Sequence, residues 1–550
     1  MKKVLCFLLL ISMTGYIFAG GKSEGDLSKV KRESYVNEYG WLVPEKTLTI
    51  SYFDARDSYN STKISKNMEL LNEFLLEEFN VEIKKLVDDL NPKERLNMML
   101  AAGDYPDVIA GLDGDARTKW IEQKRIIELT PYMDTVGNDI KSIVGDTYGF
   151  YLNDNKQLWA IPNGFGADAY PYYTATYRLD LYKEMGSPKI ETTDEYFEFL
   201  KALVKKYPVN SKNEKTYALS WHEKMQLNLV SGFWGLKDGY QEDIDHNLTH
   251  WLNTEQGLKM VKYLNRFYRE GLLDSDSFIN KQEDWEIKMN NQRVFGHLGA
   301  WYEVMFFVGH SIWKNVLPEW QEEMRFIPFS IKDENAEAAY TAPKNILGWE
   351  ERTVITDKCK NPEDVMRFIN FLTTPAGLRI ASWGVPNRPD SLWFYNGQDG
   401  SWSFNENQVQ KVIDGTYNKE IADDLGAEML FLAIPMSPFP DDNTSVCWFE
   451  QNFPEADRWM ALLYEYTSDT VFDNTARSVV FESDNPMLVI KTRVEDGIKS
   501  GFAKAVMSET EKKCEESFNK LQSDMNAIGL HDLEKFLTSE YKSKLILMGR

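Results

Sequence analysis

Hydrophobic and polar positions alternate with two different periods along the first part of the chain. A period of two, typical of strands, runs through residues 48–53, and apolar residues recur at helical spacing from Met68 to Phe79. The same patterns predict strands and helices in alternation at residues 48–53, 68–79, 81–87, 93–102 and 107–111. This β-α-β-α-β order predicts a parallel sheet with helices on its faces.

Capping residues mark several helix boundaries further along. Asn91 and Pro92 are typical of an N-cap and a first helical position, and Thr192 with Glu195 predicts a capping box. The periodicity also predicts helices that begin near Thr254 and after Asn361, a strand at 294–299, and a mostly helical C-terminal region whose helix from Thr510 to about Ile528 packs on a lobe surface.

The segment from Lys156 to Gly186 joins two such α/β units. An apolar run at 158–161 is broken by a proline and a glycine, and four aromatic residues follow within a short distance: Phe165, Tyr170, Tyr172 and Tyr173. We predict that this segment crosses between two lobes and lines the cleft between them. Aromatic rings beside short polar groups suit a sugar, whose C–H faces stack on rings while its hydroxyls need hydrogen-bond partners.

The length of the chain supports two lobes, because 550 residues exceed what one hydrophobic core usually holds together. We predict an α/β fold in two lobes; the family resemblance given below further implies mixed β-sheets flanked by helices and a hinge between the lobes. The predicted division is a signal peptide at 1–19, a linker at 20–45, the first lobe at 46–162, the second lobe at 163–340, a return to the first lobe at 341–405, and a mostly helical C-terminal region at 406–550.

Charge and composition narrow the classes of ligand. The formal net charge of −23 argues against nucleic acid, since phosphate binding needs a basic surface. The chain contains 16 Trp and 27 Tyr. Any single ring of this kind is commonly a core residue, but the excess as a group favours a ligand-binding surface.

The N-terminus predicts export. Two lysines precede an apolar run from Val4 to Met13, and small residues then offer a cleavage site, as in a secretory signal peptide. The run is too short to span a membrane. Cys6 lies inside this signal, and the remaining cysteines, Cys359, Cys447 and Cys514, have the spacing of neither a disulfide framework nor a metal site.

Candidate ligand contacts follow from the predicted ends of strands, because ligands in open α/β sheets bind beyond the carboxyl ends of the strands. Arg56 is the candidate for a carboxylate if the sugar is acidic. The full set comprises polar groups of the first lobe, residues of the crossing segment, rings of the second lobe, and one tryptophan that could face them from the first lobe: Asp54, Arg56, Asp113, Asn163, Tyr170, Tyr172, Trp221, Trp234, Trp301, Tyr302 and Trp383.

Catalytic interpretations find little support in the residues. The strand-end carboxylates at Asp54 and Asp113 are better explained as turn caps or as acceptors for sugar hydroxyls than as an acid–base pair. His246 and His250 have the spacing of zinc ligands on a helix, but no Glu follows His246 as in a zinc protease, so we interpret them as a pair on a surface helix. No catalytic residue, cofactor or metal site is predicted.

Several stretches form an ordered set along the mature chain: residues 99–109 (MLAAGDYPDVI), 158–162 (LWAIP), 177–181 (YRLDL) with Met185-Gly186, 192–196 (TTDEY), 270–274 (EGLLD) and 361–364 (NPED) with Gly377 and Gly384. This set resembles the extracellular solute-binding proteins of carbohydrate ABC importers, specifically the large family-1 members of the lipoprotein or aldouronate type. The resemblance implies a two-lobed periplasmic-binding-protein fold (type II-like) that closes on its ligand and delivers it to a membrane permease.

The chain departs from that family at two places, which change what we expect for its membrane anchor and for calcium binding. Relatives commonly carry a lipid-modified Cys after the signal, where this chain has Gly20-Gly21-Lys22, so we expect a periplasmic protein without a lipid anchor. Some relatives hold calcium in a loop that corresponds to residues 207–215. Here the loop has too few acidic oxygens for a hard cation, and we expect no calcium there.

The sequence thus favours a monomeric, non-enzymatic receptor that binds a sugar or oligosaccharide and hands it to the permease subunits of an ABC importer. Two alternatives stay open. The first is a receptor of the same fold for a peptide or another non-sugar solute, which a cleft poor in rings and rich in charge would favour. The second is a secreted carbohydrate-active enzyme, which turnover of an oligosaccharide would favour.

Overall fold

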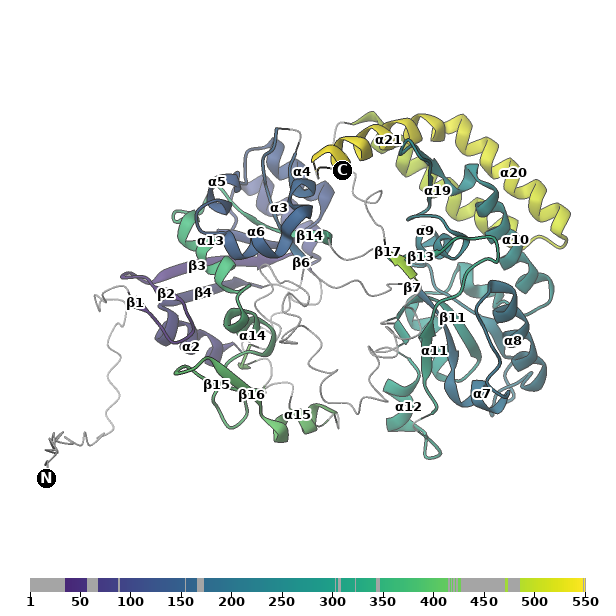
Figure 1. Ribbon diagram of the computed structural model, residues 1–550, viewed down its shortest axis with the longest axis horizontal. Coiled ribbons are helices and arrows are strands. Elements are labelled where there is room, and N and C mark those ends of the chain that lie inside the picture. The colour runs from purple at the N-terminus through teal and green to yellow at the C-terminus, as the bar shows by residue number, and fades with distance from the viewer. Residues whose placement is uncertain are drawn as a thin grey trace, which may run out of the picture.

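A computed structural model describes most of the chain. The described residues are 35–56, 68–87, 90–153, 155–165, 173–301, 303–304, 308–321, 323–342, 347–413, 416, 418, 421, 424–426, 470–472, 485–547 and 549. Two larger sheets organise them, each with its own set of helices, and the two sets lie on opposite sides of Figure 1.

The first sheet contains β3 (Leu48–Asp54), β4 (Val81–Leu86), β5 (Val108–Leu112), β6 (Ile161–Phe165) and β14 (Leu347–Ile355). The strand order is β4-β3-β5-β14-β6. β3 runs parallel to β4 and β5, which confirms the predicted β-α-β-α-β unit, whereas β14 runs antiparallel to β5 and β6. Since β14 lies more than two hundred residues after β5, the chain leaves this sheet and later returns to it.

The second sheet contains β7 (Tyr173–Arg178), β8 (Tyr217–Leu219), β11 (Val294–Ala300) and β12 (Phe326–Phe329) in the order β12-β7-β11-β8. β8 runs parallel to β11, and β7 runs antiparallel to both β11 and β12. The carboxyl ends of β8 and β11 and the first residue of β7 therefore meet at one edge of the sheet.

Smaller elements and helices surround the first sheet: β1 (Tyr35–Val36), β2 (Leu42–Val43), α2 (Glu69–Phe79), α3 (Pro92–Ala102), α4 (Gly114–Glu122), α5 (Thr130–Met133), α6 (Asn138–Val144), η3 (Gly145–Tyr151), α13 (Pro362–Phe371), α14 (Pro375–Trp383), β15 (Trp393–Asn396), β16 (Ser401–Phe404) and α15 (Glu406–Ile413). Alternate residues of β3 face opposite sides. Tyr52 joins a core cluster with α2, α13 and α14, and Phe53 joins another with α3 and α4.

The second sheet carries α7 (Leu179–Glu184), α8 (Thr193–Lys206), α9 (Leu227–Val230), η4 (Ser231–Trp234), β9 (Tyr240–Glu242), β10 (Leu248–His250), η5 (Trp251–Asn253), α10 (Glu255–Arg269), η6 (Ser275–Phe278), α11 (Gln282–Asn290) and α12 (His310–Val316). β13 (Ala339–Ala342) pairs with β17 (Thr470–Phe472). A core cluster separate from those of the first sheet joins this sheet to its helices, so the described residues form two lobes.

The predicted caps are confirmed. The Asn91 side chain accepts from the N–H of Lys93 at the start of α3. Thr192 and Glu195 form the reciprocal bonds of a capping box at the start of α8. Helices also follow Thr254 and Asn361, where the periodicity predicts them.

Two segments differ from the predictions. Residues 35–45 fall within the predicted linker, yet they form the β1–β2 hairpin and bury Trp41, whose indole N–H donates to the carbonyl of Phe79 at 2.8 Å. His246 and His250 do not lie on a helix. His250 ends strand β10, paired with β9, and His246 occupies the connecting turn with φ of +60°. The short, turn-rich sequence directly before His246, residues 241–245, has no apolar residues at helical spacing, so it does not form a helix.

Three long helices follow near the C-terminus: α19 (Pro486–Val506), α20 (Glu511–Ile528) and α21 (Leu530–Leu547). α20 confirms the predicted helix after Thr510, and its buried face joins the core of the second lobe. α21 packs on the same lobe and also contacts η3 of the first lobe. Figure 1 shows its last turns reaching towards the elements of the first lobe.

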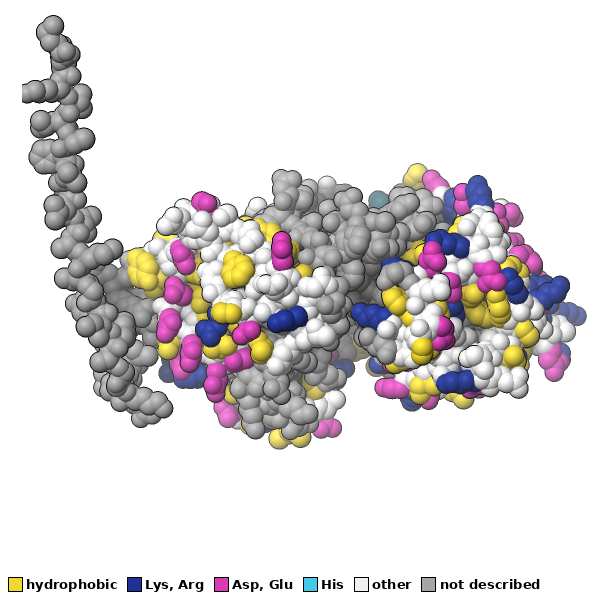
Figure 2. Space-filling model, turned by 90° about the horizontal axis from the view of Figure 1, so that it is seen from below, with side chains coloured by type: hydrophobic (Ala, Val, Ile, Leu, Met, Phe, Trp, Pro, Cys, Tyr) yellow, Lys and Arg dark blue, Asp and Glu magenta, His cyan; other side chains and the backbone are white. Residues whose placement is uncertain are grey.

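The surface carries charges of both signs. On the face shown in Figure 2, acidic and basic side chains of the described residues are interspersed rather than gathered by sign. Within the described part of the chain, no helix has both the length and the apolar character needed to cross a membrane.

Candidate ligand-binding site

The first lobe presents a buried ion pair where β3 ends. Asp54 is only 1% exposed, and its carboxylate accepts from the backbone N–H of Arg56 at 3.0 Å and from the Arg56 Nε–H at 2.8 Å. A second guanidinium nitrogen contacts the other carboxylate oxygen. This fork fixes the orientation of the guanidinium, so the two predicted residues are brought together as one rigid unit.

A glycine on the neighbouring strand makes room for this pair. Gly111 of β5 has φ of +72°, and a Cβ there would lie 2.7 Å from Cγ of Arg56. The Arg56 side chain therefore crosses the β5 backbone where only glycine fits.

Lys85 of β4 lies at the same edge. Its Nζ is buried, lies 5.5 Å from the centre of the Tyr52 ring, and has no hydrogen-bond partner among the described residues. Burial lowers the pKa of Lys85 to about 8; the Asp54 carboxylate opposes this effect and the Arg56 charge adds to it. This lysine is not among the contacts predicted from the sequence, although its place near the end of an alternating strand is a usable signal.

Asp113 and Asn163 have structural partners. Asp113 is the N-cap of α4 and accepts from the N–H of Ala116 at 2.8 Å, as the turn-cap interpretation predicts. Asn163 is 1% exposed and donates to the hydroxyl of Thr353 at 3.2 Å between β6 and β14. Asn163 therefore helps to join two strands.

In the second lobe, the ends of β8 and β11 lie side by side. The chain continues from β8 into Ser220, Trp221 and His222, and from β11 into Trp301. Trp301 is partly exposed and rests on the core of the lobe. Of the tryptophans predicted as ligand contacts, it is the one that keeps substantial surface, so it is the best placed to stack on a sugar ring.

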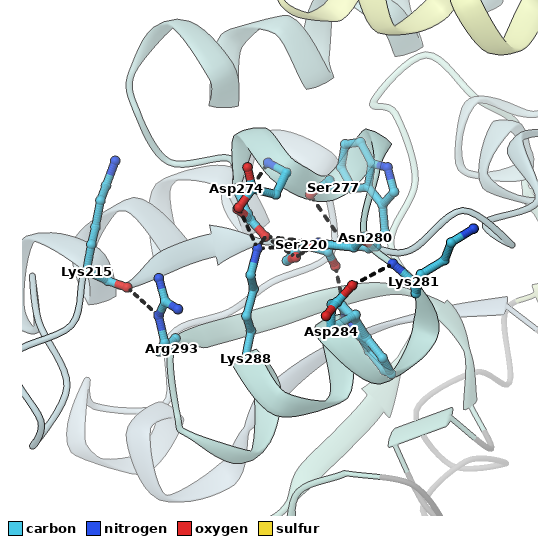
Figure 3. A network of polar contacts seen from close by, with 12 residues as sticks. Lys215, Ser220, Asp274, Ser277, Asn280, Lys281, Asp284, Lys288 and Arg293 are labelled. Carbon is cyan, nitrogen blue, oxygen red and sulfur yellow. Dashed lines mark hydrogen bonds and ion pairs between the residues drawn. The ribbon is translucent and has the colours of Figure 1, made fainter.

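A buried polar network holds the residues that follow β8, Ser220 to His222, which we call the β8 extension (Figure 3). Asp274 is 0% exposed and accepts from Nζ of Lys288 at 2.8 Å and from the hydroxyl of Ser220 at 2.7 Å. Asn280 donates to Asp274 and to the carbonyl of Trp221, both at 3.1 Å. Burial alone would raise the pKa of Asp274, but the bonds from Lys288, Ser220 and Asn280 lower it below its ordinary value.

A second buried carboxylate ties the two strand ends together. Glu303 is 9% exposed, and its two oxygens accept from Nε2 of His222 and Nε2 of His297, each at 2.9 Å. The N–H of Ala300 donates to the same side chain at 3.1 Å and closes the turn that carries Trp301. Burial by itself would raise the pKa of Glu303, but the imidazole bonds lower it to about 2.

Three predicted tryptophans are core residues instead of stacking surfaces. Trp221 is 5% exposed and packs edge-on against Phe278. Trp383 is 1% exposed and lies 4.9 Å from the ring of Phe404. Trp234 is 3% exposed and packs on a tyrosine of α10. Each ring lies on a helix or strand extension whose apolar side faces a core. From a single sequence, a tryptophan in the core cannot be distinguished from one that contacts a ligand.

Trp234 also borders a polar pocket on the second lobe. The pocket has a volume of 380 Å³, and its wall includes Lys237, Lys259, Asp333 and Tyr340. Lys237 is paired with Glu242 at 2.8 Å, and Lys259 lies 3.7 Å from Asp333. These two pairs balance, and Glu337 adds one further carboxylate to the lining, so the pocket is slightly acidic.

The remaining predicted contacts, Tyr170, Tyr172 and Tyr302, lie outside the described residues. Sequence reasoning missed Lys85, Glu303, His222 and His297. Glu303 follows the selected Trp301-Tyr302 pair directly, so extending the strand-end criterion by one residue would have found it.

The polar groups of the loop at 207–215 bond to one another and to a neighbouring helix. The side-chain oxygen of Asn210 accepts from the N–H groups of Lys212 and Glu214, at 3.0 and 2.9 Å. The ammonium of Lys212 donates to Asn291 at 2.8 Å and places a positive charge beside the loop. Among the residues that the structure describes, no group of three or more His, Cys, Asp or Glu side chains is arranged to hold a metal ion.

Comparison of the sequence with known proteins finds one partial match. No family model matches the sequence. The lipoprotein LipO of Bacillus subtilis is 24% identical over 231 residues, which cover 39% of this chain and 42% of LipO, so less than half of that relative is spanned.

Solved structures match over a much larger share. The S. pneumoniae ABC-transporter substrate-binding protein FusA, an EF-hand mutant in complex with fructo-nystose, has a TM-score of 0.66 at 16% identity, with 90% of this chain and 99% of that chain covered. The alginate-binding protein AlgQ2 without calcium ion has a TM-score of 0.62 at 18% identity, with 91% and 99% covered. An HMO-binding solute-binding protein from Bifidobacterium longum infantis has a TM-score of 0.62 at 13% identity, with 90% and 99% covered. The chain has the two-lobed fold of ABC-transporter solute-binding proteins, which confirms the predicted fold class.

Proposed function

We propose that this protein is the substrate-binding protein of an ABC importer and that it binds a sugar or oligosaccharide between its two lobes. The observation that carries the proposal is the match of nine-tenths of the chain to nearly the whole of FusA, a substrate-binding protein solved with a fructo-oligosaccharide. The other neighbours described above are named for alginate and HMO binding.

The strand-end residues support this proposal chemically. The partly exposed ring of Trp301 offers a stacking surface, and the oriented guanidinium of Arg56 and the carboxylate of Asp113 offer polar groups on the other lobe. The predicted contacts of Tyr170, Tyr172 and Tyr302 belong to the same proposal. We infer a binding protein rather than an enzyme, since the matched structures are named as binding proteins.

Closure provides the mechanism. A ligand that touches both lobes interacts with the closed form more strongly than with the open form, and it therefore shifts the population towards closure. The closed form then presents both lobe surfaces in one fixed arrangement that a permease can recognise. We propose that the protein acts as an exported monomer in the periplasm, as the N-terminal signal suggests.

A thermal-shift screen tests the proposal. A ligand that binds only the native state raises the melting temperature by mass action, by an amount that grows with its concentration over its Kd. We expect kestose, nystose or alginate oligosaccharides to raise Tm, and a panel of peptides to leave it unchanged. A shift with peptides alone would overturn the sugar proposal, and cleavage of an oligosaccharide during incubation would overturn the non-enzymatic one.

A further inference from the structure

Three hydrogen-bond donors from different parts of the second lobe converge on Glu303. Nε2 of His222, in the β8 extension, lies 2.9 Å from one carboxylate oxygen, and Nε2 of His297, in β11, lies 2.9 Å from the other. The N–H of Ala300 donates to that second oxygen at 3.1 Å. Because Trp301 lies between Ala300 and Glu303, this bond closes the short turn that carries the ring.

The surroundings of the two imidazoles determine which nitrogen carries the proton. Nδ1 of His222 accepts from the N–H of Lys224 at 3.3 Å, so in the neutral ring the proton is on Nε2, which donates to Glu303. Nδ1 of His297 is buried and has no hydrogen-bond partner among the described residues, so nothing there competes with donation from its Nε2. Both rings pack on the indole of Trp285, with ring centres 5.2 and 4.9 Å apart, which fixes their orientation. Both rings are therefore donors to the carboxylate.

Only an ionised carboxylate can accept from all three donors. Burial disfavours the charged form of Glu303, but the bonds from both imidazoles outweigh this effect and hold its pKa at about 2, so near neutral pH the side chain is ionised and only accepts. A glutamine has the same shape, but its NH2 group would face either His222 or the pair of His297 and Ala300. In either orientation at least one N–H group loses its acceptor.

We propose that Glu303 is a positioning residue for ligand binding, which holds the turn at 300–303 in one conformation so that a saccharide meets the ring of Trp301 already oriented. This inference rests on the proposed function and adds to it how the stacking ring is ordered. A side chain that is ordered before binding loses less entropy when a ligand stacks on it. An apolar side chain would join the two strands without the cost of burying a charge, so the carboxylate is better explained by the turn that it closes.

Isothermal titration calorimetry with nystose and with an alginate trisaccharide measures the effect on binding. We expect Glu303→Gln to weaken the binding of the saccharide that the native protein binds by about fivefold to tenfold, which corresponds to ordering one more side chain on binding. Glu223→Gln is the matched control, because Glu223 follows His222 directly but is exposed and pairs with Lys281 at the surface. The control should bind as the native protein does. An unchanged affinity in Glu303→Gln would overturn the inference.

The same change in a Trp301→Ala background separates positioning from general support of the lobe. If Glu303 acts through the ring, removing the ring first should leave Glu303→Gln with less than about a twofold effect on affinity. Equal fold-changes in the two backgrounds would show that the carboxylate supports the lobe as a whole, which also overturns the inference. Should Glu303→Gln fail to fold, Glu303→Asp replaces it, since it keeps the charge but is one carbon too short to reach all three donors.

Fluorine NMR of protein labelled with 5-fluorotryptophan reports on the ring without any ligand. The chain contains 16 Trp, and the resonance that disappears in Trp301→Phe identifies Trp301. We expect Glu303→Gln to shift and broaden this resonance and to leave that of Trp383, in the first lobe, unchanged. A Trp301 resonance that stays the same would contradict the inference while the saccharide receptor stands. If neither saccharide binds the native protein, the proposed function falls, and this resonance alone decides whether Glu303 orders the ring.

Discussion

Gly111 determines whether Arg56 can hold its forked contact with Asp54. We predict that Gly111→Ala destabilises the protein for two reasons, a positive φ of +72° and a Cβ placed 2.7 Å from Arg56. The backbone term costs about 1–2 kcal/mol, and the clash adds about 1–3 kcal/mol if the arginine must move. Urea unfolding followed by circular dichroism measures the loss, and ligand affinity should fall with it.

Gly40→Ala is the matched control for this change. Gly40 has φ of +82°, and no atom of the described residues lies within 4 Å of the added Cβ, so we expect the backbone cost alone. Equal losses of stability in the two variants would show that Arg56 adapts to the methyl group, and the close approach would then have no role in holding the pair.

His250 makes stability depend on pH in a defined window. Burial lowers the pKa of His250 to about 3, so the folded protein keeps it neutral down to that pH. The unfolded chain protonates this group below about pH 6.5. Between pH 6.5 and 3 the unfolded state thus binds more protons, and stability falls as the pH is lowered, by an amount on the order of a few kcal/mol in total.

We predict that His250→Asn flattens this part of the stability curve. Asn can still accept from the N–H of Leu252, as the imidazole does at 3.2 Å. The measurement is the free energy of unfolding between pH 7 and 4 for the native protein, His250→Asn and the control His246→Asn, whose side chain is 53% exposed. An unchanged slope in His250→Asn would assign the acid sensitivity to other groups.

At the scale of elements, the Asp274 network decides how firmly the β8 extension is held. Asp274→Asn removes one of the two carboxylates that pair with Lys288, whose side chain is 12% exposed. Asp276, at 3.0 Å, is then its remaining acidic partner. Breaking one side of a buried pair typically costs about 3–5 kcal/mol. We predict a loss in that range by chemical denaturation.

The double variant Asp274→Asn/Lys288→Met tests the cause of that loss. Removing the lysine as well takes away the uncompensated charge, so the double variant should be more stable than Asp274→Asn alone. If the double variant loses as much stability as Asp274→Asn and Lys288→Met lose together as single variants, the bonds to Ser220 and Asn280 hold the β8 extension and the ion pair does not.

Elements whose boundaries are encoded locally could be predicted. The Thr192–Glu195 box and the Asn91 cap lie within four residues of the helices they begin, so the sequence contains the whole interaction. The Asp54–Arg56 pair is equally local. The parallel unit at 48–111 was also predictable, because its alternation of periods is regular.

Contacts between distant segments could not be predicted. Glu303 accepts from His222, eighty-one residues earlier, and nothing in either stretch names the other. Trp221 and Trp383 are buried by residues from other elements, so their local sequence looks the same for a core ring as for a ligand-facing one. Trp41 was assigned to a linker because its partner, the Phe79 carbonyl, belongs to another element.

At the scale of the whole molecule, α21 connects the lobes. Leu533, Leu537 and Tyr541 anchor it in the core of the second lobe, while Nζ of Lys544 donates to the carbonyl of Leu152 in the first lobe at 2.7 Å. A contact that joins the lobes in one arrangement biases the equilibrium between open and closed forms. We therefore expect the C-terminal helix to set part of the energy of lobe movement.

We predict that Lys544→Met widens the range of lobe arrangements. Losing one hydrogen bond from a charged donor costs about 1–2 kcal/mol, enough to change the ratio of two arrangements by about fivefold or more. Small-angle X-ray scattering should record a larger radius of gyration for the free variant. Lys542→Met is the control, since Lys542 donates to Asn247 within the second lobe at 2.8 Å. An equal radius in all three proteins would mean that η3 and the apolar face of α21 hold the lobes without this bond, and α21 would then be a static support rather than an adjustable one.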